Sequence, residues 1–154
     1  MKRTSLSDSL CPVARTLDLI GDWWTLLIVR DALGGVRRFS EFQRSLGVAK
    51  NILSSRLKTL VAEGVMQIGP ASDGSAYQEY VLTQKGKDLY PILIALGQWG
   101  NQYMFNENET CSRVVERETQ QPLAPIKLRS QDGRELAAEQ VEVIVGQKGT
   151  NFAS

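Results

Sequence analysis

The sequence of 154 residues contains no histidine and only two cysteines. Without histidine, Ser-His-Asp and Cys-His catalysis, histidine-ligated metals and an imidazole pH switch are excluded. Cys11 and Cys111 lack Cys-x-x-Cys spacing, so they indicate neither a zinc site nor a disulfide scaffold, and both are expected to be reduced thiols. We therefore predict no catalytic residues, no metal site and no cofactor, in a protein that is not an enzyme.

Long apolar runs are also missing. The most apolar stretches, around residues 23–29 and 91–96, are interrupted well short of the roughly 20 apolar residues that a membrane span needs. The first ten residues are polar and charged and do not resemble a signal peptide. We expect a cytoplasmic protein with no membrane partner.

Helical periodicity dominates the first part of the sequence. Apolar residues recur every three to four positions over residues 12–33, which predicts one helix or two helices that meet near Gly21. Ser40 and Gln43 have the spacing of a capping box and predict a short helix over residues 40–46.

A further helix is predicted over residues 50–63, after a turn at Gly47 and before a closing glycine, Gly64. One stripe of this helix is apolar and is expected to face the core; it consists of Leu53, Leu57, Leu60 and Val61. The sequence therefore predicts two helices, over residues 40–46 and 50–63, that are joined by a turn of a few residues.

Strand periodicity follows. Residues 65–68 and 77–82 read as strands and flank a tip rich in Gly, Pro, Ser and Asp, which predicts a β-hairpin. Thr83 is a suitable N-cap, and residues 87–103 carry apolar side chains on one helical face.

The sequence changes character near its C-terminus. Residues 1–104 carry a net charge of +3 and residues 105–154 carry −2, which together give the overall +1. The later part is polar and has strand-like patches at residues 113–115, 125–128 and 141–145, with a turn at Asp132-Gly133. We expect one domain over residues 1–105 and a small β-rich appendage over residues 106–154.

The order helix, helix, turn, helix, hairpin and helix is that of a winged helix-turn-helix. The predicted fold class is mainly α with a β-hairpin wing (α+β), with a small C-terminal β appendage. Between Gly34 and Gly64 there are six basic and two acidic residues, a net charge of +4 that attracts duplex DNA.

The polar face of the helix over residues 50–63 supplies candidate base contacts. Asn51 can pair with adenine and Lys58 with guanine, whereas serine discriminates little between bases. The candidate DNA-binding set, which includes expected phosphate contacts, is Arg37, Arg38, Ser40, Lys50, Asn51, Ser54, Ser55, Arg56 and Lys58. Taken singly, each of these side chains also fits an ordinary solvated helix face. The tip of the hairpin is poor in Arg and Lys, so its contact with DNA stays open.

Within residues 11–103, the range of the resemblance described next, four motifs occur in order: Cys11-Pro12-Val13-Ala14-Arg15, Leu19-Ile20-Gly21-Asp22-Trp23-Trp24-Thr25-Leu26-Leu27-Ile28, Arg37-Arg38-Phe39-Ser40-Glu41-Phe42 and, ending at residue 86, Leu82-Thr83-Gln84-Lys85-Gly86. This ordered set resembles the HxlR family of bacterial winged-helix transcriptional regulators, relatives of the MarR type. The resemblance implies a homodimer that binds pseudo-palindromic operators in double-stranded DNA.

The resemblance also implies that the N-terminal helix and the long C-terminal helix lie between the subunits. Candidate interface residues are Leu17, Leu96, Trp99 and Tyr103. The aromatic pair adds apolar surface that a domain of about 90 residues does not fully cover, and large apolar patches usually mark a partner. Packing of the long helix on its own domain is the alternative.

Cys11 is the candidate sensor, because an equivalently placed cysteine responds to oxidants or electrophiles in several members of the family. Pro12 is expected to open a helix, which puts the thiol near the positive end of the helix dipole, where thiols are more reactive. The alternative is a small buried hydrophobic residue.

The C-terminal segment departs from the pattern of relatives that carry Cys-rich, zinc-ribbon-like turns there. Residues 118–120 and 131–133 occupy the corresponding positions and contain no cysteine. We expect no structural zinc, since one nearby thiol cannot form such a site.

The leading hypothesis is a sequence-specific DNA-binding transcriptional regulator, a homodimeric repressor that responds to oxidants or electrophiles through Cys11. The alternative is a winged-helix protein interaction module without DNA binding, which the near-neutral net charge and the wing poor in basic residues favour. Whether a small-molecule effector binds stays open.

Overall fold

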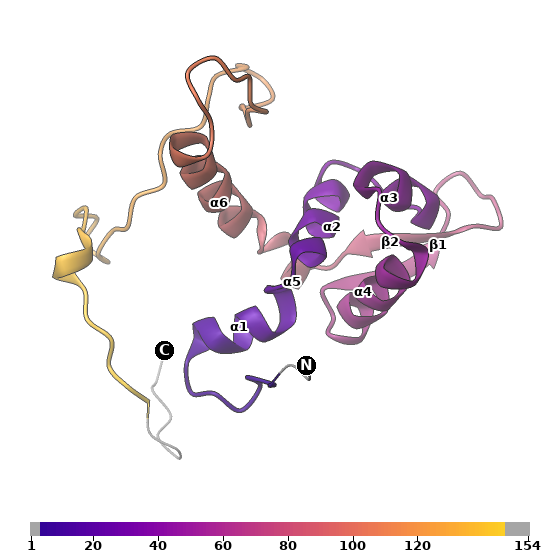
Figure 1. The fold of residues 1–154 in the computed structure, drawn as a ribbon, viewed down its shortest axis with the longest axis horizontal. Coiled ribbons are helices and arrows are strands. Elements are labelled where there is room, and N and C mark those ends of the chain that lie inside the picture. Colours follow the sequence, from indigo (N-terminus) through magenta and orange to yellow (C-terminus); the bar gives the residue numbers. More distant parts are fainter. Residues whose placement is uncertain (1–3, 147–154) are drawn as a thin grey trace. The chain divides into compact units, whose positions relative to one another are not determined.

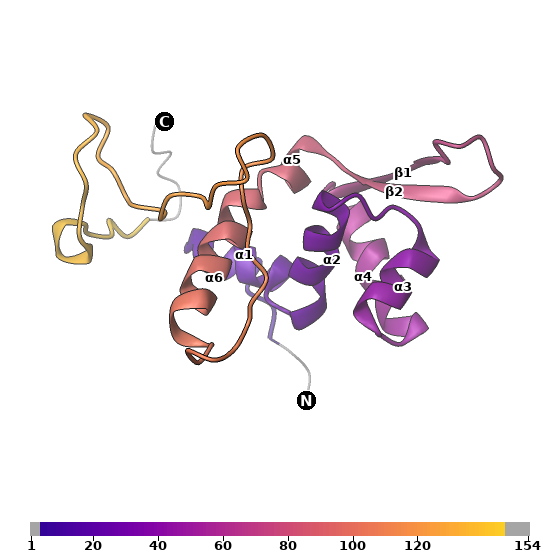
Figure 2. The ribbon, with the colours of Figure 1, turned by 90° about the horizontal axis from the view of Figure 1, so that it is seen from above.

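A computed structural model of the protein describes residues 4–146 (Figures 1 and 2). In chain order its elements are α1 (Pro12–Ile20), α2 (Trp23–Leu33), α3 (Phe39–Leu46), α4 (Lys50–Ala62), β1 (Met66–Pro70), β2 (Gln78–Leu82), α5 (Gln84–Lys87), α6 (Tyr90–Tyr103) and a 3-10 helix at Ala138–Gln140. This order confirms the predicted winged helix-turn-helix. None of the helices within the described range is long and apolar enough to cross a bilayer.

The chain packs as two compact units, residues 4–90 with 145–146, and residues 91–144. The first unit holds the helix-turn-helix and the wing, and the second holds α6 from Pro91 onward with the C-terminal segment. The packing therefore divides the chain earlier than the predicted domain boundary at 105/106, which stays a prediction. The end of the predicted appendage, residues 147–154, lies outside the described residues.

Helices α1 and α2 are separate, so the alternative of two helices is confirmed. Pro12 takes the first position of α1, as predicted, and Gly21 ends the helix. A Cβ at Gly21 would lie 2.3 Å from the carbonyl oxygen of Leu17, so a larger residue requires the backbone to shift. Asp22 then caps α2 by accepting hydrogen bonds from the backbone N–H groups of Trp24 (2.9 Å) and Thr25 (3.1 Å).

Helix α3 begins one residue earlier than predicted and has a different cap. Arg38 is the N-cap residue, and the Glu41 carboxylate accepts hydrogen bonds from the backbone N–H groups of Arg38 (3.0 Å) and Arg37 (3.2 Å). The same hydrogen bonds hold the pKa of Glu41 below its ordinary value. The predicted capping box of Ser40 and Gln43 is wrong, because Phe39 takes the first helical position and the third falls on Glu41.

One core joins α2, α3, α4 and the hairpin. Helix α4 contacts α2, α3 and β1, and Leu53, Leu57 and Leu60 of its predicted apolar stripe are at most 1% exposed. Val61, the fourth predicted member, is only partly buried. Burial of one leucine contributes about 1.5–3 kcal/mol, so this stripe holds α4 firmly in place.

The C-terminus of α4 is fixed by the segment that follows the wing. Gly64 adopts a positive φ of 71°, which glycine reaches without a steric penalty, so the predicted stop is confirmed. Thr83 Oγ1 donates a hydrogen bond to the carbonyl of Gly64, and Lys85 Nζ donates one to the carbonyl of Glu63 at 2.7 Å. The orientation of α4 is thus fixed both by its buried apolar stripe and by hydrogen bonds at its C-terminus.

Strands β1 and β2 form an antiparallel hairpin in which Met66 lies opposite Leu82 and Pro70 opposite Gln78. Both views show the tip of this wing projecting beyond α2, α3 and α4 (Figures 1 and 2). Thr83 caps α5, as predicted for the residue after the hairpin, by accepting a hydrogen bond from the backbone N–H of Gly86.

The predicted helix over residues 87–103 is shorter than expected. It begins as α6 at Tyr90, because Pro91 lacks an N–H group and fits only the first turn of a helix.

The C-terminal segment contains less β structure than predicted. Residues 106–146 form two isolated antiparallel bridges, Val115 with Pro122 and Arg129 with Glu135, and no longer strand among the described residues. A strand needs a neighbour along its length, and the prolines at 122 and 125 remove two backbone donors. The predicted turn at Asp132-Gly133 is present, with a hydrogen bond from the backbone N–H of Gly133 to the carbonyl of Ser130.

Candidate nucleic-acid interface

The exposed face of α4 carries the predicted base-reading side chains. Asn51, Ser54, Ser55 and Lys58 are all exposed, on the side of the helix away from its buried leucines. Within residues 4–146 the side chains of Asn51, Ser54 and Lys58 make no hydrogen bond or ion pair. Lys50, the first residue of α4, is also exposed, so this face presents donors and a positive charge to solvent.

Arg56, a predicted phosphate contact, faces the cap of α2 instead of open solvent. Its Nε lies 3.3 Å from Asp22 Oδ1, an ion pair without hydrogen-bond geometry. The side chain of Arg56 is 35% exposed and that of Asp22 is 13% exposed. Asp22 therefore both starts α2 and holds α4 against it, while the phosphate contact of Arg56 stays a prediction.

Arg38 links the start of α3 to the tip of the wing. Its guanidinium group donates a hydrogen bond to Asp73 at 2.5 Å, and its Cζ lies 5.3 Å from the centre of the Tyr77 ring, within the range of a cation–π contact. Hydrogen bonds from Ser75, followed by that from Arg38, lower the pKa of Asp73 to about 2. The hydrogen bond to Asp73 also raises the pKa of Arg38.

Arg37 faces a second acid of the wing. Glu79 is buried, accepts a hydrogen bond from Ser72 Oγ at 3.0 Å, and has Oε2 3.7 Å from the guanidinium of Arg37. The backbone N–H of Tyr80 donates a hydrogen bond to the carbonyl of Arg37 at 2.8 Å. Arg37 is nevertheless about half exposed, so its outer edge faces solvent.

The local charge is smaller than the sequence indicated. Asp22, Asp73 and Glu79 lie outside residues 34–64 but pair with three of its arginines, which reduces the charge of this region from +4 to +1. The basic residues of this region with no ion pair among the described residues are Arg44, Lys50 and Lys58. The sequence by itself indicated a structural role for Asp22, since an aspartate directly before a helical run is a common N-cap. No pattern in the sequence indicated that Asp73 and Glu79 would pair with these arginines.

The remaining candidates lie on α1, α3 and α6. Ser40 is exposed at the second position of α3. Cys11 is exposed at the N-cap of α1, and its backbone N–H donates a hydrogen bond to Ser9 Oγ at 3.1 Å. Leu17, Leu96, Trp99 and Tyr103 are 48–62% exposed. The structure brings Trp99 and Tyr103 together, with ring centres 5.3 Å apart.

The arrangement of α3, the turn and α4 beside a hairpin agrees with a comparison against known families. The sequence model described as HxlR-like helix-turn-helix matches residues 19–108. The chain belongs to the HxlR family. This confirms the predicted resemblance over most of the range in which the motifs occur.

Relatives of this HxlR protein carry names of the same class. Mb3122 of Mycobacterium bovis, named as an HTH-type transcriptional regulator, is 46% identical over 92 residues, which make up 60% of this chain and 58% of the relative. The crystal structure of PA1607, described as a candidate transcription factor, superimposes on this chain with a TM-score of 0.87. The two sequences are 53% identical, and the alignment covers 92% of this chain and 99% of the PA1607 chain.

A further solved structure, the redox regulator HypR in its reduced form, is 31% identical in sequence and has a TM-score of 0.53. The alignment covers 61% of this chain and 94% of the HypR chain. Taken with the family match, these similarities place the chain among proteins that are named helix-turn-helix transcriptional regulators or transcription factors.

Proposed function

We propose that this HxlR protein is a homodimeric repressor that binds a pseudo-palindromic operator in double-stranded DNA. The observation that carries the proposal is the exposed polar face of α4, on which Asn51, Ser54 and Lys58 make no hydrogen bond or ion pair among the described residues, while the opposite face is buried in the core. A recognition helix needs this combination, because base contacts require free donors on a rigidly placed helix.

The charge distribution supports specificity through direct contacts. With three arginines paired to acids, the region offers few free cations for phosphate binding, and Asn51 and Lys58 supply the base-reading chemistry. Lys50, Arg44 and the outer edge of Arg37 are the proposed phosphate contacts. Two copies of α4 about 34 Å apart match successive major grooves on one side of the duplex.

The proposal is tested by fluorescence anisotropy with the DNA adjacent to the gene and with scrambled DNA. Replacing Asn51, Ser54 and Lys58 together by alanine is expected to remove the preference for the specific site and leave the unfolding temperature unchanged, because all three are exposed. Lys87→Ala, which removes an exposed charge on α5, serves as the control. Retained selectivity in the triple variant contradicts the assignment of α4.

Salt dependence distinguishes the two roles open to Lys58. If Lys58 contacts a phosphate, Lys58→Ala lowers the slope of log affinity against log salt by about 1 per protomer. If it reads a base, the slope stays nearly the same and discrimination between sites falls by about 1–3 kcal/mol.

We also propose that Cys11 makes the regulator responsive to oxidants or electrophiles. Its exposure at the N-cap of α1 supports this, and the similarity to the redox regulator HypR agrees with it. Diamide is expected to change the operator affinity of the wild type and of Cys111→Ser, but not of Cys11→Ser. An equal response in all three proteins contradicts the proposal.

The acidic wing favours one alternative, a protein interaction module without DNA binding. Asp73 and Glu79 occupy the hairpin that contacts DNA in many winged-helix proteins, and the tip from Ser72 to Ser75 has no basic side chain. Absence of any sequence-selective complex even at low salt supports this alternative and rejects the repressor.

A further inference from the structure

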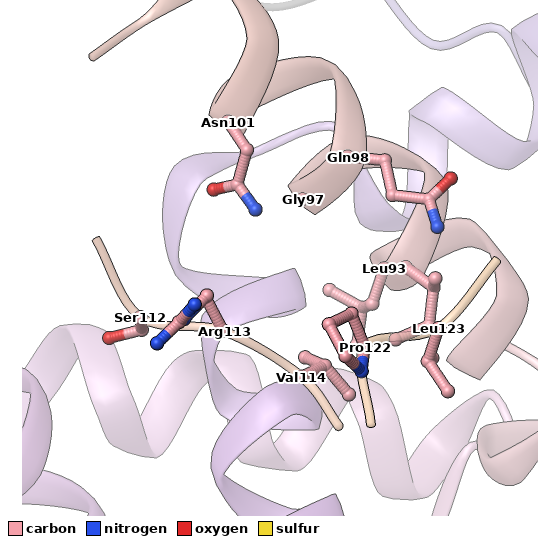
Figure 3. Close-up of a pocket in the computed structure, with 10 residues that line it drawn as sticks. Leu93, Gly97, Gln98, Asn101, Ser112, Arg113, Val114, Pro122 and Leu123 are labelled. Carbon is pink, nitrogen blue, oxygen red and sulfur yellow. The ribbon is translucent and has the colours of Figure 1, made fainter. Parts of the chain in front are cut away.

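Helix α6 and the C-terminal segment line a partly open cavity of about 180 Å³ within the second compact unit (Figure 3). The segment is pinned to the helix by the side-chain amide of Gln98. Its Nε2 donates a hydrogen bond to the carbonyl of Ala124 at 2.9 Å, and its Oε1 accepts one from the backbone N–H of Ile126 at 2.7 Å. These two hydrogen bonds hold the segment that directly follows the lining residues Pro122 and Leu123 against α6.

The two ends of this cavity differ in chemistry. Leu93, Val114, Pro122 and Leu123 gather at one end, and Asn101, Ser112 and Arg113 lie at the other (Figure 3). The side chains at the polar end make no hydrogen bond or ion pair among the described residues, and Arg113 has no acidic partner there. The cavity thus combines an apolar wall with unpaired donors, as ligand sites do.

Gly97 keeps the cavity open. This residue lies inside α6 and lines the cavity, and a Cβ built on it has no neighbouring atom within 4 Å. Glycine inside a helix costs about 0.5–1 kcal/mol relative to alanine. A side chain here would project into free space, so the glycine is not required by packing.

We propose that the cavity binds a small aromatic or cyclic carboxylate of about the size of benzoate. A dry cavity of about 150 Å³ accommodates benzene, so the somewhat larger volume here admits a ring with one carboxylate. The ring contacts Leu93, Pro122 and Leu123, and the carboxylate accepts hydrogen bonds from Arg113, which offers a planar pair of donors, and from Asn101. This proposal does not depend on DNA binding.

The test uses the full-length chain and titration calorimetry with three probes: benzoate, benzyl alcohol without the charge, and acetate without the ring. Benzoate is expected to bind with a Kd on the order of 1 mM, and the other two at least about tenfold more weakly. Arg113→Gln is expected to remove the preference for benzoate over benzyl alcohol. No saturable binding of benzoate, or equal binding of benzoate and benzyl alcohol to the wild type, overturns the proposal.

Two matched glycine variants locate the site. Gly97→Leu fills the cavity and is expected to abolish benzoate binding, whereas Gly100→Leu, at another open glycine of α6 outside the lining, leaves it unchanged. Circular dichroism checks that both variants fold, and Gly97→Ala, a smaller change, is expected to weaken binding even if Gly97→Leu unfolds. Binding that persists in a folded Gly97→Leu protein, or in Gly97→Ala with an unchanged Kd, overturns the proposed location.

Discussion

Asp22 connects the start of α2 with α4. One of its carboxylate oxygens accepts hydrogen bonds from two backbone N–H groups of α2 and also lies 3.3 Å from Arg56 on α4. The other accepts a hydrogen bond from the hydroxyl of Thr25. A single side chain therefore supports both the cap of one helix and the position of another.

We expect Asp22→Ala to lower the free energy of unfolding by about 1–2 kcal/mol, because the cap of α2 is lost. Asp22→Asn keeps an oxygen acceptor for the backbone and loses only the charge facing Arg56, so its loss is expected to be below about 1 kcal/mol. Urea unfolding followed by circular dichroism measures both changes. If the two variants are equally destabilised, the ion pair with Arg56, and not the cap of α2, is the main contribution of Asp22 to the free energy of unfolding.

The carboxyl group of Asp73 is expected to titrate near pH 2. Its pKa lies below the ordinary value of 3.8, chiefly because of hydrogen bonds from Ser75 and then from Arg38. The contact of Arg38 with the wing is therefore fully present above about pH 4 and is lost as the pH falls through 2. Carboxyl chemical shifts recorded by NMR against pH test this.

Two variants separate the causes of this shift. Ser75→Ala removes the side-chain hydrogen bond, which is the largest single cause of the low pKa of Asp73, and keeps the bond from the backbone N–H; Arg38→Gln removes the guanidinium charge, and both variants are expected to raise the pKa of Asp73. Titration of wild-type Asp73 at its ordinary value would show that the tip of the wing is not closed onto Arg38 in solution.

At the scale of secondary-structure elements, two helical glycines are expected to respond in opposite directions to the same change. A Cβ at Gly86 in α5 would lie 2.2 Å from the carbonyl oxygen of Val65 and 2.8 Å from Leu82 Cδ2, so Gly86→Ala is expected to destabilise the protein by about 1–3 kcal/mol. Gly97→Ala in α6 adds a methyl group to free space and is expected to stabilise it by about 0.5–1 kcal/mol.

Thermal and urea unfolding measure both variants. Stabilisation of both variants would show that helix propensity, and not the close approach of Gly86 to Val65, decides the effect at Gly86. The close approach also gives a physical reason for the motif Leu82-Thr83-Gln84-Lys85-Gly86. Thr83 and Lys85 donate hydrogen bonds to the carbonyls of Gly64 and Glu63, just after α4, and Gly86 allows α5 to approach the carbonyl of Val65.

At the scale of the whole molecule, the exposed apolar side chains of α6 support the proposed homodimer. Trp99 is 58% exposed and Tyr103 is 62% exposed, although both are large apolar residues of one helix face. Replacing both by serine is expected to convert a dimer into a monomer in size-exclusion chromatography with light scattering, because aromatic residues often carry most of the binding energy of an interface.

Ile68→Ser, which changes an exposed apolar residue of the wing, is the matched control and is expected to leave the dimer intact. A wild-type protein that is monomeric at micromolar concentration contradicts the proposal. Loss of the dimer in the control would indicate that the wing, and not α6, lies in the interface.

Much of the fold follows from patterns within short stretches of the sequence. The stripe of Leu53, Leu57 and Leu60, the proline that opens α1 and the glycine that ends α4 are local patterns, and local chemistry determines helix faces and helix ends. The exposed residues on the polar face of α4 were predictable for the same reason, since they lie opposite an apolar stripe.

Tertiary structure decided the features that depend on residues far apart in the chain. Only folding places Asp73 beside Arg38 and Asp22 beside Arg56, and these pairs reduce a charge that the sequence overstated. The single bridges of the C-terminal segment and the cavity beside α6 are decided in the same way. Periodicity reports which face of an element is apolar, whereas ion pairs, strand neighbours and cavities arise between elements whose separation no local pattern encodes.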